Sequence, residues 1–151
     1  MQLDESTTVA TLMLGIPTAA FNGEKRVIVG HPDDTVASAQ RLFHRYDLHH
    51  LPIVADGDQL VGMVSVRDVM RAYTEAPNKD REEVQATKLG TIMTPNPKAI
   101  RSTTPIREAL SILANATFQA LPVVDKLGRI EGIVTTRDLI KIVHERLVQK
   151  R

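Results

Sequence analysis

Apolar positions along the chain follow helical spacing in some stretches and form short β-type runs in others. After Thr35, a candidate N-cap, apolar residues recur every three or four positions over 36–46, and this spacing predicts a helix. Two runs rich in β-branched residues, 51–55 and 59–65, flank an Asp-Gly-Asp turn and predict a hairpin. Helical spacing returns over 66–75. These stretches therefore predict a helix, a β-hairpin and a second helix.

The same order of elements recurs 70 residues further along the chain. Leu-Pro-Ile-Val at 51–54 returns as Leu-Pro-Val-Val at 121–124. Gly-Met-Val-Ser-Val-Arg-Asp at 62–68 returns as Gly-Ile-Val-Thr-Thr-Arg-Asp at 132–138. Without any gap, eight of the 36 positions over 35–70 are identical to their partners, which indicates an internal duplication.

The duplication extends the prediction to a second set of elements. Thr104 is expected to cap the partner helix, and Pro105 to open its first turn. Two strands and a final helix are predicted over 120–124, 129–135 and 136–149. Short strands near 27–29 and 98–100 precede the first helix of each copy. Each repeat is therefore predicted to be β-α-β-β-α.

The repeats also define the domain organisation. Upstream of them, Thr-Leu-Met at 11–13 matches Thr-Ile-Met at 91–93 at an offset of 80, so the first repeat carries about ten extra residues, predicted as a loop insertion over 14–34. The predicted parts are repeat one, a charged linker and repeat two, at 9–75, 76–86 and 87–148. Since one unit of roughly 60 residues would leave an apolar face uncovered, we expect an α+β fold of two repeats with pseudo-twofold symmetry, sheets inward and helices outward.

Composition narrows the classes of function. The 151 residues include 42% hydrophobic and 25% charged residues, as in globular proteins. The 19 basic and 18 acidic residues give a net charge of +1, and aromatic residues make up 3%, so nucleic-acid binding is not favoured and no membrane partner is expected. The chain lacks cysteine, which excludes disulfides, thiol catalysis and Cys-ligated metals and fits a reducing compartment.

The duplicated Gly-x-x-Ser/Thr-x-Arg-Asp motif carries the strongest chemical signal. It places Ser65 and Thr135 where a strand passes into a helix, whose N-terminal N–H groups can receive a phosphate. Asp68 and Asp138, three residues later, are suited to accept hydrogen bonds from the two hydroxyls of a ribose. The same spacing is also a capping box, in which both side chains serve the helix itself. Two copies in equivalent places favour a nucleotide site.

These motifs resemble a known family. The segments LPIV…GMVSVRD and LPVV…GIVTTRD, each with TLM or TIM upstream, are similar over about residues 9–148 to a tandem pair of cystathionine β-synthase (CBS) domains, a Bateman module. The resemblance implies a regulatory module that binds AMP, ADP, ATP or S-adenosylmethionine in the cleft between repeats, with no catalytic cofactor. It also implies a homodimer and an unidentified regulated protein.

The resemblance also implies roles for further residues. It carries ribose binding to Asp68 and Asp138, and phosphate binding to Ser65 and Thr135. In similar modules the residues before the Leu-Pro strand approach the phosphates, and here these are His49, His50, Gln119 and Ala120. The upstream segments at Thr11 and Thr91 are expected to line the base pocket, together with the uncharged Gln119 and Ala120. Each upstream segment is expected to serve the site whose Asp belongs to the other repeat.

The two expected sites differ in charge. Because His49 and His50 can be protonated, a di- or triphosphate is predicted to prefer the first site. Arg67 and Arg137 are candidates for a further phosphate contact, with a solvated salt bridge as the alternative. Among the apolar residues of the second helices, a dimer face is expected at Val69, Ile140, Val143 and Leu147.

Other chemistry finds little support in the sequence. Adjacent residues of a strand point to opposite faces, so His49 and His50 are not expected to share a metal ion, and no metal site is predicted. The chain has no Gly-x-Ser-x-Gly, Walker or Gly-x-Gly-x-x-Gly motif, so we do not expect an enzyme. Its acidic opening is unlike a signal peptide, and a cytoplasmic protein is expected. The alternatives are an interaction module with vestigial clefts and a nucleic-acid-binding protein.

Overall fold

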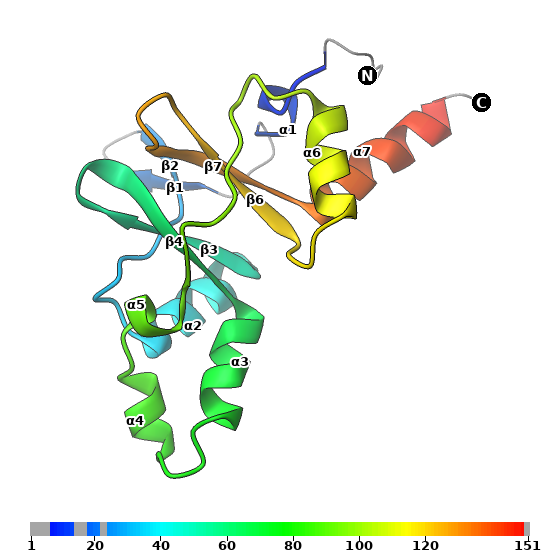
Figure 1. Cartoon of the computed structure of the whole chain (residues 1–151). Coiled ribbons are helices and arrows are strands. Elements are labelled where there is room, and N and C mark those ends of the chain that lie inside the picture. Colours follow the sequence, from blue (N-terminus) through cyan, green and yellow to red (C-terminus); the bar gives the residue numbers. More distant parts are fainter. Residues whose placement is uncertain (1–6, 14–17, 22–23, 150–151) are drawn as a thin grey trace. The chain divides into compact units, whose positions relative to one another are not determined.

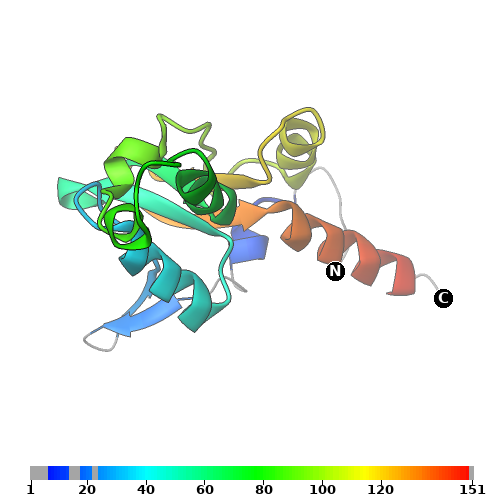
Figure 2. The same cartoon turned by 90° about the horizontal axis from the view of Figure 1, so that it is seen from below.

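The computed structural model describes residues 7–13, 18–21 and 24–149 (Figures 1 and 2). The chain forms two compact units. One, the first-repeat unit, is Pro17–Pro97, and the other, the second-repeat unit, combines Met1–Ile16 with Lys98–Arg151. Each unit contains one of the two predicted β-hairpins, packed with helices, so the predicted α+β class with two repeats is confirmed.

The first-repeat unit is built around the predicted helix and hairpin. Helix α2 (Val36–Tyr46) begins at Thr35, whose hydroxyl accepts a hydrogen bond from the Ser38 N–H at 3.2 Å. Strands β3 (His50–Ala55) and β4 (Gln59–Ser65) pair antiparallel across a short 3₁₀ turn, η1 (Asp56–Asp58). Helix α3 (Val66–Thr74) follows β4 directly and contacts α2.

Residues after α3 complete this unit. In sequence, they belong to the linker and to the first part of the second repeat. Helix α4 (Arg81–Gln85) and helix α5 (Leu89–Ile92) both contact α3, and strand β5 (Thr94–Pro95) pairs antiparallel with β4. The upstream segment of the second repeat therefore folds onto the first repeat (Figure 1).

The insertion predicted as a loop over 14–34 is not a plain loop. In its described part, β1 (Thr18–Phe21) and β2 (Glu24–Val27) form an antiparallel ladder, while residues 14–17 and 22–23 lie outside the described residues. The strand predicted near 27–29 does not form there, since Val27 ends β2 and only a single parallel bridge follows at Gly30, and the strand predicted near 98–100 is likewise reduced to a single parallel bridge. Gly30 pairs with Ile53, and Ile100 pairs with Val123.

The second-repeat unit repeats the hairpin and its two helices. Its elements are α1 (Ala10–Met13), α6 (Ile106–Ala114), β6 (Ala120–Val124), β7 (Ile130–Thr135) and α7 (Thr136–Gln149). Helix α6 contacts both β6 and α7 (Figures 1 and 2). The predicted cap is wrong here, because Pro105 occupies the N-cap position and the Thr104 hydroxyl instead accepts from the Arg101 N–H at 3.0 Å, within the preceding turn.

Each unit has its own hydrophobic core. In the first-repeat unit, Leu51 and Ile53 of β3 pack with Leu89 of α5, and all three are fully buried. In the second-repeat unit, Leu121 and Val123 occupy the equivalent places on β6. The two cores hold the ends of β4 and β7, where the duplicated motifs lie, in fixed positions relative to the helices that follow.

Candidate functional site

Both duplicated motifs form capping boxes. At the start of α3, the Asp68 N–H donates to Ser65 Oγ at 3.2 Å, and the Ser65 N–H donates to Asp68 Oδ2 at 2.7 Å. At the start of α7, the Asp138 N–H donates to Thr135 Oγ1 at 3.2 Å, and the Thr135 N–H donates to Asp138 Oδ2 at 2.8 Å. The capping interpretation is thus correct for both motifs, and ligand binding would be an additional role.

The backbone N–H groups that could receive a phosphate are largely used within the protein. Besides the two capping bonds at each helix, the Val66 N–H donates to the His49 carbonyl at 3.0 Å. The Thr136 N–H donates in the same way to the Gln119 carbonyl at 2.9 Å. A phosphate at either helix start would therefore have to displace existing hydrogen bonds, which disfavours that position.

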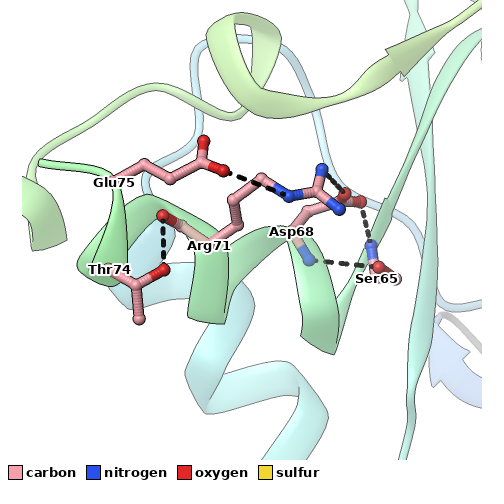
Figure 3. Close-up of polar contacts among 5 residues, drawn as sticks. All are labelled: Ser65, Asp68, Arg71, Thr74 and Glu75. Atoms are coloured by element: carbon pink, nitrogen blue, oxygen red, sulfur yellow. Dashed lines mark hydrogen bonds and ion pairs between the residues drawn. The ribbon is translucent and has the colours of Figure 1, made fainter.

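The second oxygen of Asp68 faces an arginine that the sequence analysis did not single out. Arg71 Nη1 lies 3.6 Å from Asp68 Oδ1, and Arg71 Nε lies 3.9 Å from Glu75 Oε1 (Figure 3). The Asp68 side chain is only 13% exposed, whereas those of Arg71 and Glu75 are 57% and 72% exposed. Asp68, Arg71 and Glu75 form a row of charges along α3. Their spacing of three and four residues could have identified this row from the sequence.

A cavity of about 390 Å³ in the first-repeat unit contains this row. Asp68 of the first repeat and Thr91 of the second-repeat upstream segment, which were predicted to serve one site, both line it. Its remaining lining comes from α3, the connector, α4 and α5, namely Arg71, Ala72, Glu75, Ala76, Lys79, Val84, Thr87 and Ile92. The cavity thus combines an apolar wall with a charged rim.

The other residues predicted for the first site lie elsewhere. Neither His49, which is exposed, nor His50, which is half-buried, lines the cavity, and Arg67 is exposed outside it. Burial lowers the pKa of His50, the charge of His49 lowers it further, and Asp68 raises it by a smaller amount. The lowered pKa disfavours the imidazolium form, so His50 is a weaker partner for a phosphate than a freely protonatable histidine would be.

In the second-repeat unit, the predicted residues are spread over several elements. Helix α1, which carries Thr11, contacts β7, and Thr135 ends that strand. Gln119 is exposed, Ala120 is buried at the start of β6, and Arg137 is exposed on α7. The upstream segment of the first repeat thus packs in the unit that contains Asp138, as the prediction of exchanged segments requires.

An apolar groove of about 220 Å³ separates α6 from α7. It is lined by Leu110, Leu113, Ala114, Thr136, Leu139, Ile140 and Val143. In the first repeat, the residues equivalent to Leu110 and Val143 are Gln40 and Tyr73, and the Tyr73 hydroxyl donates to Gln40 Oε1 at 2.9 Å. Three residues of the predicted dimer face are exposed, but Val69 belongs to the core, with 5% exposure.

The described part of the chain offers neither a cluster of metal ligands nor a membrane-spanning helix. Among residues 7–13, 18–21 and 24–149, no three His, Asp or Glu side chains are grouped so that they could hold a metal ion. Within the same ranges, no helix combines the length and apolar character needed to cross a bilayer.

Comparison with known proteins gives consistent matches over both repeats. The CBS domain family model matches residues 24–75 and 89–145. A CBS domain-containing protein of Dictyostelium discoideum is 33% identical over 117 residues, covering 74% of this chain and 80% of its own. The inosine-5'-monophosphate dehydrogenase of Methanocaldococcus jannaschii is 32% identical over 78% of this chain, which spans only 22% of that enzyme.

Solved structures share the same fold. CBSX2, a CBS-pair protein of Arabidopsis thaliana solved in complex with AMP, has a TM-score of 0.73 and 28% identity, covering 96% of this chain and 99% of its own. The CBS domain pair of MJ0100, solved with 5'-methylthioadenosine and S-adenosyl-L-methionine, has a TM-score of 0.73 over 91% of this chain and 99% of its own. At 24% identity, the second likeness concerns the fold alone.

Proposed function

Because the chain belongs to the CBS domain family, we propose that it is a regulatory module that binds an adenosyl ligand such as AMP, ADP, ATP or S-adenosylmethionine. The observation that carries the proposal is that Asp68 and Thr91, 23 positions apart in sequence, line one cavity. AMP binding by CBSX2, a relative at 28% identity, supports the same ligand class.

The lining of the cavity suits a nucleoside. A volume of about 390 Å³ falls within the range of small-molecule sites. The apolar side chains of Ala72, Ala76, Val84 and Ile92 offer a surface for the adenine, and Asp68 Oδ1 can accept a hydrogen bond from the ribose diol. Regulation follows if the ligand binds one arrangement of the protein more tightly than another, since only differential affinity shifts a conformational equilibrium.

Replacing Asp68 tests the ligand proposal. We expect Asp68→Ala to weaken adenine nucleotide binding by about 10- to 100-fold, because a hydrogen bond to a charged group contributes about 1.5–3 kcal/mol. The measurement is a thermal-shift titration of wild type and variant with AMP, ADP, ATP, S-adenosylmethionine and NAD.

Asp138→Ala is the control for stability, since it removes the same capping box at α7. Each variant is expected to lose about 1 kcal/mol of stability through its cap. Affinity at the first-repeat cavity should fall only in Asp68→Ala. Equal ligand shifts in wild type and Asp68→Ala contradict the ribose role, and the absence of any ligand shift in wild type favours an interaction module without a ligand.

We also propose that the module acts as a homodimer through α7. Ile140 and Leu147 are 62% and 64% exposed and, with Val143, recur at the three- and four-residue spacing of helix–helix seams. We expect wild type to sediment as a dimer at micromolar concentration and Ile140→Glu as a monomer. Met70→Glu, at the equivalent position of α3, should leave the dimer intact. A monomeric wild type contradicts this part of the proposal.

A further inference from the structure

We propose that Lys79 and Arg71, at the linker side of the first-repeat cavity, bind the anionic end of the adenosyl ligand. This inference rests on the proposed function, because it requires a ribose at Asp68. The anionic end is either a 5'-phosphate, as in AMP, or the α-carboxylate of a 5'-linked amino acid, as in S-adenosylmethionine. The linker, predicted from the sequence as a charged connector, thereby gains a binding role.

The positions expected from the sequence are poorly suited to hold the anion. The first-turn N–H groups of α3 contributed by Val66 and Asp68 already donate to the His49 carbonyl and to Ser65 Oγ. His49 and His50 do not line the cavity. An anion inside the cavity must therefore find its partners among other side chains.

Two cationic side chains line the cavity, and they differ in their existing partners. The Arg71 guanidinium is shared between the carboxylates of Asp68 and Glu75, at 3.6 and 3.9 Å. Among the described residues, no carboxylate forms an ion pair with Lys79. Lys79 is therefore the cation whose charge an incoming anion can neutralise without breaking an ion pair.

The spacing along α3 fits a ligand that extends from Asp68 towards the linker. With a helical rise of 1.5 Å per residue, Arg71 lies about 4.5 Å and Glu75 about 10.5 Å beyond Asp68 along the axis. The connector turns back after α3, where the Lys79 N–H donates to the Ala76 carbonyl at 3.1 Å. A ligand with its ribose diol on Asp68 and its 5'-substituent extended along α3 would reach Arg71 and Lys79.

The test compares ligands that differ only in the anionic end. Isothermal titration of the full chain with AMP and with adenosine separates the phosphate contribution from that of the nucleoside. We expect Lys79→Ala to weaken AMP binding by about fivefold, the upper range for one exposed ion pair, and to leave adenosine unchanged. Lys79→Arg should restore AMP affinity, and Lys126→Ala, in the exposed β6–β7 turn, is the matched control.

Further measurements distinguish the two kinds of anion and test whether the anion binds at His50 instead. S-adenosylmethionine and 5'-methylthioadenosine form a second pair, and a loss confined to S-adenosylmethionine would assign the carboxylate instead of the phosphate. Lys79 is exposed, so its replacement should leave the melting temperature unchanged. If wild type binds all four ligands and Lys79→Ala binds them equally well, the placement of the anion is wrong and the proposed function stands. The same conclusion holds if only His50→Ala weakens AMP binding. If wild type binds none, both fail.

Discussion

Gly62→Val is expected to lower the free energy of unfolding by about 1–3 kcal/mol, the usual cost of over-packing a buried site. Gly62 is buried on β4, between Ile53 of β3 and Pro95 of β5. A Cβ atom at this position would overlap Met93 Sδ and lie 2.9 Å from Met93 Cγ and 3.1 Å from the Thr94 carbonyl oxygen. The thioether can move, but the backbone oxygen cannot, so a branched side chain would push β5 away from β4.

The same substitution should weaken ligand binding, because the displaced segment also forms the cavity. Thr91 and Ile92 line the cavity immediately before Met93. We expect urea denaturation to show the loss of stability and nucleotide titration to show weaker binding. The control is Gly57→Ala, where a Cβ would meet no atom within 4 Å and the φ of +70° alone causes strain of about 1–2 kcal/mol. Unchanged nucleotide affinity in Gly62→Val would refute the coupling between β4 and the cavity.

The duplication made the core elements of each repeat predictable. Apolar spacing correctly placed α2, α3 and α7, and β-branched runs correctly placed both hairpins, because these elements bury one face against a core of the same unit. Thr104 shows the limit of this reasoning. It aligns one position before Thr35, and that single step puts its hydroxyl in a preceding turn and leaves Pro105 as the N-cap.

The wall of the candidate site could not be predicted from periodicity. Helices α4 and α5 have five and four residues, too few to display a helical repeat, and β5 has two. Their places depend on contacts with α3 and β4, which are distant in sequence. Lys79 and Val84 therefore read as parts of a polar connector, although both line the cavity.

The motif itself was ambiguous for a chemical reason. The carboxylate of Asp68 has two oxygens, and one is sufficient for the capping box. The other is left for Arg71 and for a ligand. One residue type at one spacing can thus serve the helix and also the ribose of the proposed function, so the pattern alone cannot separate the two roles.

Leu51→Ala and Leu121→Ala are each expected to lower the free energy of unfolding by about 2–5 kcal/mol, the range for a fully buried leucine. The two residues are a matched pair. Both are fully buried, and each stands opposite a buried valine, Val64 and Val134, in the register of its hairpin. Since Leu51 and Leu121 belong to separate core clusters, each substitution should loosen mainly its own unit.

Hydrogen exchange measured along the chain distinguishes the two effects. Leu51→Ala should reduce protection of the β3 and β4 amides and weaken nucleotide binding, because Leu51 shares its core with Leu89 at the start of α5. Leu121→Ala should reduce protection of the β6 and β7 amides and leave affinity at the first-repeat cavity unchanged. Leu127→Ala, at 66% exposure, should change stability by less than about 0.5 kcal/mol. If either core variant reduced protection equally in both hairpins, the two cores would unfold as one cooperative block and the ligand site would depend on both.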